Sequence, residues 1–316
     1  MNDRVKRLRQ ESLDAIPSIS HERAVLLTKF YNQEKNITSI PEQRARAFAH
    51  LLQYKEICIN QGELIVGERG PSPKATPTYP EICCHSQSDL DILDSREKIP
   101  YRVNPKTKEH YQAMIIPYWK GKTIRELIFK EMPEDWLTAY QAGIFTEFME
   151  QRAPGHTVLG DKIYHFGMVD FLERINKAIE SLDFYTDSDA YAKKEQLRAM
   201  AITANAIIHF AKRHAEKARQ LAESDPDPIR ASELIKIADI CQKVPAHSPD
   251  TFWEALQYYW FVHIGVITEL NTWDAFNPGR LDQHLYPFFR NGLEDGTLTR
   301  ETAKELLQCF WIKFNN

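Results

Sequence analysis

Cysteine is scarce in this sequence, which limits the compartments and the chemistry that the chain suits. The 316 residues contain five cysteines, and two of them, Cys83 and Cys84, are adjacent. A sparse, odd set in a chain of this length argues against a disulfide framework and favours a reducing cytoplasm. Adjacent cysteines fit neither zinc-ligand spacing nor a redox pair, so we expect no metal ion. A metal site formed with His85 stays open as the alternative to buried thiols.

Long apolar runs and an excess of one charge are also missing. No apolar stretch reaches the length of a membrane span, and the basic residues Arg4 to Arg9 lead into Glu11 and Asp14 rather than into the apolar run of a signal peptide. The formal net charge is −4 and the pI is about 6.3. We therefore expect no nucleic-acid partner and no membrane partner.

Several motifs of common enzymes are absent as well. The sequence has no glycine-rich phosphate loop, no GxSxG elbow, no HExxH pair and no cysteine triplet of the radical-SAM type. It has no internal repeat, and strand and helix signals do not alternate densely enough for a complete barrel or a doubly wound sheet. The chain is therefore either an all-helical protein or the helical part of a larger α/β protein.

Helical periodicity dominates what is present. Helices are predicted to open at Ser20 and at Pro41, and a long one runs from Asp187 to the break at Asp225-Pro226. A shorter helix follows it. Ser248-Pro249 is then predicted to cap a helix, TFWEALQYYWFVHIGVI, that is apolar nearly all round and so should be deeply buried.

Two earlier stretches lack this periodicity. ELIV, at Glu63 to Val66, is predicted to be a short strand or an extended segment. Residues 68–110 contain six prolines and are predicted to form a long irregular passage, which is usually functional or wraps a neighbour.

The last helical pattern carries a wide apolar stripe. After a capping residue, Thr299, the stripe contains Leu306, Leu307, Phe310, Trp311 and Phe314. A helix this apolar needs a partner surface. Either an earlier segment covers the stripe or the covering segment is missing from the chain, and we expect the second.

Phe145 to Thr157, FTEFMEQRAPGHT, is the first stretch that looks unlike plain scaffold. It passes from a predicted helix, carrying Phe145 and Phe148, through a Pro154-Gly155 turn to His156. A turn that ends a helix can aim the next side chain into a pocket. The alternative is that His156 is a structural histidine after an ordinary turn.

Glu269 to His284, ELNTWDAFNPGRLDQH, is the second such stretch. Asp274 lies between Trp273 and Phe276. A carboxylate among aromatic rings loses solvation, so its pKa is expected to rise, and such a group can hold or pass a proton as a general acid. The alternative is a structural acceptor for backbone N–H groups. Arg280 and Asp282 are expected to form a surface or interfacial ion pair.

At these two stretches the sequence resembles the glycyl radical enzymes of the pyruvate formate-lyase-like superfamily, and within them the hydroxyproline dehydratase branch. The resemblance covers essentially the whole chain. The matching motifs are ISHERA at Ile19 to Ala24, GELIVGERG at Gly62 to Gly70, PTYPEICCH at Pro77 to His85, FTEFMEQRAPGHT, YWFVHIGVITELNTWDAFNPGRLDQH from Tyr259, and the final WIKFNN. The PGH and PGR-x-D elements belong to the whole superfamily, whereas the FTEFMEQRAPGHT and NTWDAF strings are specific to the branch.

The resemblance implies a fold and a reaction. It implies the N-terminal helical part of a ten-stranded α/β barrel, with few short strands, in which residues 1–316 form part of one pyruvate formate-lyase-like domain. In this family a glycyl radical, installed by a separate radical-SAM activating enzyme, generates a thiyl radical on a cysteine loop. Hydroxyproline then loses a C5 hydrogen and its 4-hydroxyl, as water, to give 1-pyrroline-5-carboxylate. The full-length enzymes are homodimers.

The resemblance also assigns site residues. Phe148 would pack on the pyrrolidine ring, His156 and Asp274 would contact polar groups of the substrate, and Asp274 would assist proton movement at the departing hydroxyl. The family's GC-x-E cysteine loop and RVxGY-like glycine loop have no counterpart in these 316 residues, and Cys309 lacks the flanking glycine and acid. We therefore expect an N-terminal fragment, with no cofactor of its own, that is inactive alone.

Two other functions stay open at this stage. Choline lyase, glycerol or propanediol dehydratase, and formate acetyltransferase share the superfamily elements, so the substrate can differ. A non-catalytic helical protein that binds a small amino acid or a partner protein is a different class altogether. A cooperative, monodisperse monomer would favour that class, whereas exposure of the apolar stripe would favour a fragment.

Overall fold

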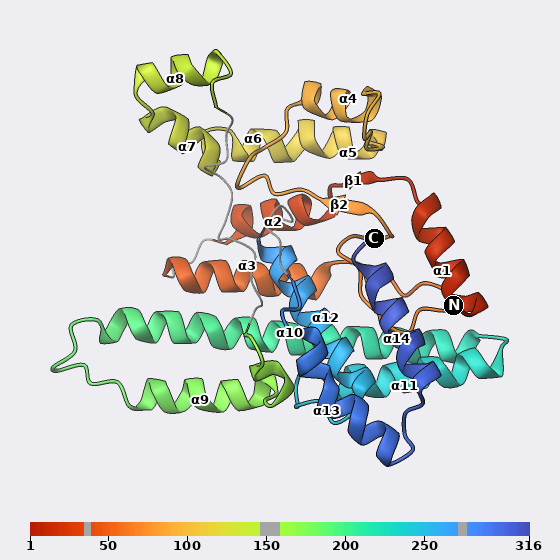
Figure 1. The fold of residues 1–316 in the computed structure, drawn as a ribbon. Coiled ribbons are helices and arrows are strands. Elements are labelled where there is room, and N and C mark those ends of the chain that lie inside the picture. Colours follow the sequence, from red (N-terminus) through yellow and green to blue (C-terminus); the bar gives the residue numbers. More distant parts are fainter. Residues whose placement is uncertain (35–38, 146–158, 271–276) are drawn as a thin grey trace.

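The computed structural model describes residues 1–34, 39–145, 159–270 and 277–316, and in these residues the chain is mainly helical (Figure 1). The prediction of a mainly helical chain with few short strands is confirmed. The helices are α1 Asp3–Asp14, α2 Glu22–Gln33, α3 Ile40–Tyr54, α4 Gln87–Ser95, α5 Pro105–His110, α6 Ile116–Trp119, α7 Ile124–Glu131, α8 Glu134–Gln141, α9 Met168–Glu180, α10 Ala190–Ser224, α11 Pro228–Lys243, α12 Phe252–Glu269, α13 Leu281–Glu294 and α14 Arg300–Lys313. A π-helical turn, η1, spans Tyr111–Ile115, and a 3-10 turn, η2, spans Lys162–Tyr164.

The helix starts follow local capping chemistry. The predicted second helix is α3, whose first turn contains Pro41 and whose capping residue is Ser39. The predicted start of α12 is wrong by a few residues: Thr251, rather than Ser248-Pro249, is the cap. The Thr251 hydroxyl accepts from the Glu254 amide at 3.3 Å, and the Glu254 carboxylate accepts from the Thr251 amide at 3.1 Å.

The passage at residues 68–110 is more regular than predicted. It contains the strand β2, Ala75–Pro77, which pairs in parallel with β1, Ser18–Ser20. It also contains α4, which opens with a capping box between Ser86 and Asp89. The prolines misled the prediction because four of them lie in loops, Pro77 ends β2 and Pro105 opens α5, so α4 is left free of proline.

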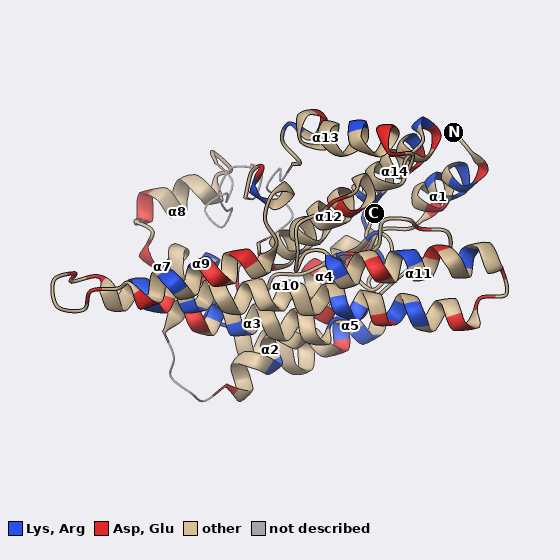
Figure 2. Cartoon of the chain, turned by 90° about the horizontal axis from the view of Figure 1, so that it is seen from below, with Lys and Arg blue, Asp and Glu red and all other residues tan. Residues whose placement is uncertain are grey.

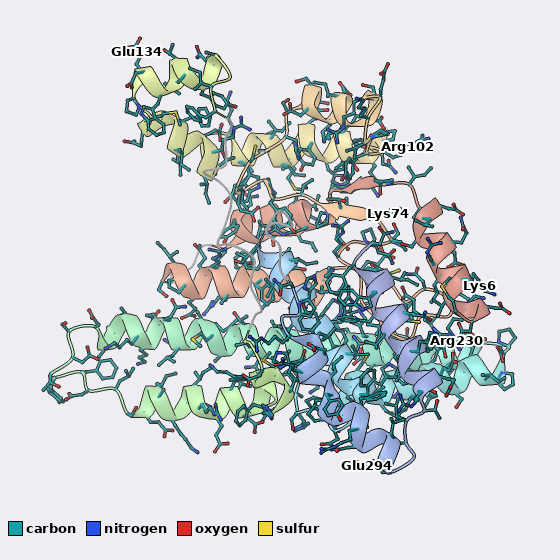
Figure 3. The ribbon with its side chains drawn as sticks, in the orientation of Figure 1. Lys6, Lys74, Arg102, Glu134, Arg230 and Glu294 are labelled. Carbon is teal, nitrogen blue, oxygen red and sulfur yellow. The ribbon has the colours of Figure 1, made fainter. Side chains whose placement is uncertain are left out.

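The helices form layers around α12 (Figure 1). On one side the long helix α10 packs against α9, α11 and α3, and α2 covers α3. The α4–α8 region lies beyond α2, so Glu134 at the start of α8 and Glu294 at the end of α13 mark opposite ends of the molecule in Figure 3. Figure 2 shows both signs of charge mixed along the outer helices α9, α10 and α11, while α12 is mostly uncharged.

The buried side chains form two hydrophobic clusters that meet at α3. Phe48 and Leu52 belong to the larger cluster, which also takes in α10, α11, α12 and α14. Ala47 and Leu51 belong to the smaller one, with residues of α2 and η1. As predicted, α12 is deeply buried, because nearly all of its side chains contribute to the larger cluster or hydrogen-bond within it. This helix therefore lies in the interior, where it contacts α10, α11, α13 and α14.

The predicted extended segment at residues 63–66 pairs with a helix instead of a strand. The Gln257 side chain accepts from the Val66 amide and donates to the Val66 carbonyl, both at 2.9 Å. Trp253 and Trp260, one turn before and one turn after Gln257, donate their indole N–H groups to carbonyls at 2.8 and 2.9 Å on either side of Val66. One face of α12 thus satisfies the backbone groups that a neighbouring strand would otherwise take.

The apolar stripe of α14 is covered in part from within the chain. Leu306 is 1% exposed and Phe310 is fully buried, with Phe310 edge-on to Tyr259 and Trp260 of α12. Helix α1 packs on α14 from another side. The expectation that the cover is missing is therefore wrong for these two positions, because segments distant in sequence supply it. Trp311 remains 51% exposed.

Acid destabilisation is expected from two histidines buried in this core. Burial lowers the pKa of His214 to about 3 and that of His263 to about 4, from an ordinary value of 6.5. The unfolded chain takes up protons below pH 6.5 while the folded chain keeps both rings neutral, so stability is lost as pH falls toward 4. When the pH falls from 6.5 to about 5, the free energy of unfolding should decrease in both proteins. The decrease should be about 1.5 kcal/mol smaller in His263→Phe than in the wild type.

Urea unfolding at the two pH values measures this difference. The phenylalanine ring keeps the stacking of His263 on Trp260, at 5.1 Å between ring centroids. The exposed His209 provides the matched control, His209→Gln. Equal losses in the wild type and in His263→Phe would show that His263 is not held neutral.

Candidate functional site

The three side chains predicted to contact a substrate lie outside the described residues. Phe148 and His156 fall within residues 146–158, and Asp274 falls within residues 271–276. Arg280 and Asp282, predicted to pair, are both exposed at the start of α13. The structure describes the helices and loops that precede and follow these two segments in sequence.

Described residues next to each segment line one groove, which we call the α3–α12 groove. It has a volume of about 770 Å³ and is bounded by α3, α9, α10 and α12. Leu159, which follows the first segment, lines it, and so do Glu269 and Leu270, which precede the second. Leu159 and Leu270, more than a hundred residues apart in sequence, therefore line the same groove. A groove of this volume is within the range of small-molecule sites.

The described lining of the groove is mostly apolar. Phe48, Phe171, Ile207 and Val266 contribute to it. The described lining residues include no histidine, cysteine, aspartate or lysine. Such a wall can bind an apolar ring and exclude water, but it offers little for proton transfer.

The few charged groups of the lining are engaged. Arg44 of α3 forms an ion pair with Glu269, the last residue of α12. The Arg174 guanidinium lies 3.9 Å from the centroid of the Phe166 ring. Arg44 thus links α3 to the end of α12 in the lining of the groove.

Phe145, at the start of the first segment, is not helical as predicted. Helix α8 ends at Gln141, and Phe145 lies beyond it, with its ring 5.6 Å from that of Trp136 and 5.9 Å from that of Tyr140. Arg125 donates to the Tyr140 hydroxyl at 2.7 Å. Gly143, with a φ of 72°, ends the helix early because it adopts the left-handed conformation.

The adjacent cysteines are half-buried. The Cys83 sulfur accepts a hydrogen bond from Arg125 at 3.3 Å, and burial raises the pKa of Cys84 to about 12. Burial lowers the pKa of His85. Among the described residues, no group of His, Cys, Asp and Glu side chains is arranged to hold a metal ion. The simpler interpretation of Cys83 and Cys84, partly buried thiols, fits this geometry.

A buried charge cluster joins two motifs that the sequence shows only separately. Lys313, in the final WIKFNN motif, forms ion pairs with Glu63, at 2.7 Å, and with Glu68, both in GELIVGERG. Asn316 donates to Glu68 at 3.1 Å, and Asn60 donates to Glu63 at 2.9 Å. These groups border a second cavity of about 220 Å³.

In the charge cluster two buried carboxylates share one buried cation. Burial by itself lowers the pKa of Lys313, but the two carboxylates outweigh it and hold that pKa above its ordinary value. Burial, with Glu63 nearby, raises the pKa of Glu68. Sequence reasoning missed this contact because 245 residues separate Lys313 from Glu68. A lysine within an apolar helix is the signal that could have pointed to it.

Within the described ranges, no helix is long and apolar enough to cross a membrane. This agrees with the lack of long apolar runs in the sequence.

Known proteins are similar to this chain in both sequence and fold. The pyruvate formate lyase-like family model matches residues 1–316. Trans-4-hydroxy-L-proline dehydratase of Clostridioides difficile is 52% identical over 314 residues, covering 99% of this chain and 40% of the relative. The crystal structure of hydroxyproline dehydratase from that organism, with trans-4-hydroxy-L-proline bound, superposes with a TM-score of 0.96 at 51% identity, covering 100% of this chain and 40% of the other.

A more distant solved structure agrees. A glycyl radical enzyme from Archaeoglobus fulgidus gives a TM-score of 0.91 at 32% identity, and the match covers 99% of this chain and 40% of that one. The chain thus spans about 40% of the length of the relatives it matches. Because the family model matches the chain from its first residue to its last, the protein belongs to the pyruvate formate lyase-like family.

Proposed function

We propose that this chain forms the N-terminal, mainly helical part of the α/β barrel of a glycyl radical dehydratase, and that the whole enzyme converts trans-4-hydroxy-L-proline to 1-pyrroline-5-carboxylate and water. One observation carries the proposal: the chain superposes over its full length on a hydroxyproline dehydratase whose structure contains that substrate. The 52% identity to the same kind of enzyme supports it.

Three residues of this chain are proposed to contact the substrate. Phe148 packs on the pyrrolidine ring, His156 contacts a polar group of the substrate, and Asp274 moves a proton at the departing hydroxyl. The position of the α3–α12 groove supports this assignment, since Leu159 and Leu270, at the borders of the two segments, both line it. Aromatic neighbours of Asp274 in sequence would favour its protonated form.

The radical chemistry is proposed to come from outside these 316 residues. When present, the glycyl radical and its partner cysteine supply the hydrogen abstraction, and this chain's residues bind the substrate, orient it and handle the proton. The proposal includes a radical-SAM activating enzyme, a homodimer and a cytoplasmic location for the whole enzyme. The chain alone is expected to be inactive.

Turnover assays test the proposed reaction. The full-length protein that contains this chain, activated anaerobically with a radical-SAM activating enzyme, should convert trans-4-hydroxy-L-proline to 1-pyrroline-5-carboxylate, measured by mass spectrometry. Choline, glycerol and propane-1,2-diol serve as competing substrates. Preferred turnover of any of these would move the protein to another branch of the superfamily.

A further inference from the structure

The C-terminal end of α12 is held by more partners than a helix end needs. The last carbonyls of a helix have no helical donors. Here the Leu270 amide donates a hydrogen bond to the Val266 carbonyl at 2.8 Å, which completes the last turn of the helix. The next two carbonyls, of Ile267 and Thr268, accept from side chains that come from distant parts of the chain.

Tyr79 and Arg23 supply those side chains. The Tyr79 hydroxyl donates to the Ile267 carbonyl, and Arg23 Nε donates to the Thr268 carbonyl at 2.6 Å. Arg44, on the side of the α3–α12 groove, pairs with Glu269. Three consecutive residues of α12 are thus each fixed by a different element: the loop that follows β2, then α2, then α3.

Arg23 and Tyr79 are themselves locked together. Arg23 is only 6% exposed, and its guanidinium lies 4.0 Å from the centroid of the Tyr79 ring. Its two terminal nitrogens also bind both carboxylate oxygens of Glu81, at 3.1 and 2.5 Å. We call Arg23, Tyr79 and Glu81 the clamp of α12. A bidentate pair of this kind fixes direction as well as charge.

The clamp joins three motifs that the sequence contains separately. Arg23 belongs to ISHERA, Tyr79 and Glu81 belong to PTYPEICCH, and the carbonyls they hold belong to the stretch that leads into NTWDAF. A lone buried ion pair would usually order a loop and no more. Here Tyr79 and Arg23 both bind the last turn before residue 271, Glu81 holds Arg23 in place, and Leu270 lines the groove.

We propose that Arg23 and Tyr79 are positioning residues for the substrate site: by fixing the carbonyls of Ile267 and Thr268, they hold the last turn of α12, which the segment that carries Asp274 follows in sequence. This inference rests on the proposed function for its effect on catalysis, though not for the clamp itself. Misplacing a reacting group by about 1 Å can lower a rate about 100-fold. The clamp therefore acts on turnover more than on substrate affinity.

Tyr79→Phe tests the inference because it removes one hydroxyl and keeps the ring under Arg23. Tyr258→Phe is the matched control: Tyr258 is also a buried tyrosine whose hydroxyl donates to a backbone carbonyl, that of Phe166, at 3.0 Å. Hydrogen exchange on this chain should be about tenfold faster at the amides of residues 268–270 in Tyr79→Phe, as expected for the loss of one hydrogen bond. Tyr258→Phe should leave those amides unchanged.

The second measurement uses the activated full-length protein. Tyr79→Phe should lower kcat for hydroxyproline about tenfold or more with KM changed less than about threefold, because proton transfer depends on position more steeply than binding does. If Tyr79→Phe left hydrogen exchange at residues 268–270 unchanged, the structural role of the clamp would be wrong. If the kcat of Tyr79→Phe equalled that of Tyr258→Phe, the positioning role would be wrong. A wild type that does not turn over hydroxyproline would contradict the proposed function, while the exchange measurement still decides the clamp.

Discussion

Asp274→Asn is expected to lower hydroxyproline dehydration by the activated full-length protein about 100-fold or more. The proposed role of Asp274 is to pass a proton to the departing hydroxyl, and an amide cannot do so. Because asparagine has nearly the same shape and keeps one carbonyl oxygen, binding of the substrate should change much less than turnover. The measurement is kcat and KM for hydroxyproline at saturating activation.

The radical content of each preparation, measured by electron paramagnetic resonance, separates a failed reaction from failed activation. Asp239→Asn is the matched control, since Asp239 is an exposed residue of α11, a helix that contributes no described residue to the lining of the α3–α12 groove. If Asp274→Asn kept more than about a tenth of the wild-type kcat, the proton-transfer role of Asp274 would be wrong.

Lys313→Met is expected to destabilise the folded chain by about 3–5 kcal/mol, the usual cost of removing one partner of a buried ion pair. Methionine fills a similar volume but leaves Glu63 and Glu68 without their shared cation. Both carboxylates are buried, at 4% exposure each, so they would have to take up protons or draw in water. Urea unfolding at neutral pH measures the loss.

Two further variants identify its cause. Lys304 is an exposed lysine of the same helix, so Lys304→Met should change stability by less than about 0.5 kcal/mol. Adding Glu68→Gln to Lys313→Met should recover part of the loss, because one of the two uncompensated charges is removed. Equal losses in Lys313→Met and Lys304→Met would mean that the charge cluster contributes little.

Much of the helical framework could be predicted from local sequence. Apolar spacing located α2, α3, α10 and α12, because this signal acts within a few turns of the same helix. The predicted starts were off by one to three residues: Ser20, for example, lies in β1, and α2 begins at Glu22. Short-range signals failed where an element ends by backbone geometry, as at Gly143 after α8, or where a loop rich in proline also holds a well-capped helix, as at Ser86. The cover of Phe310 could not be predicted, since its partners lie on α12.

The candidate site was predictable only as separate segments. The two motifs that carry Phe148, His156 and Asp274 stood out in the sequence, and the structure adds that their borders share one groove. The assignment of those three residues stays a prediction. The clamp was not foreseeable, because an arginine followed by ordinary helical residues does not reveal that it binds Glu81, 58 residues away, and Thr268, 245 residues away.

The pairing of Val66 with Gln257 sets an order of events during synthesis. The two residues are 191 positions apart, so the backbone groups of Val66 leave the ribosome long before the helix that binds them. At typical bacterial and eukaryotic translation speeds that interval is roughly 10–40 s. During this time the GELIVGERG segment lacks the helix that satisfies its backbone groups, and α3 can pack on α10 only once α10 has been synthesised. Chaperones that shield apolar segments should therefore associate with the nascent chain until α12 has emerged.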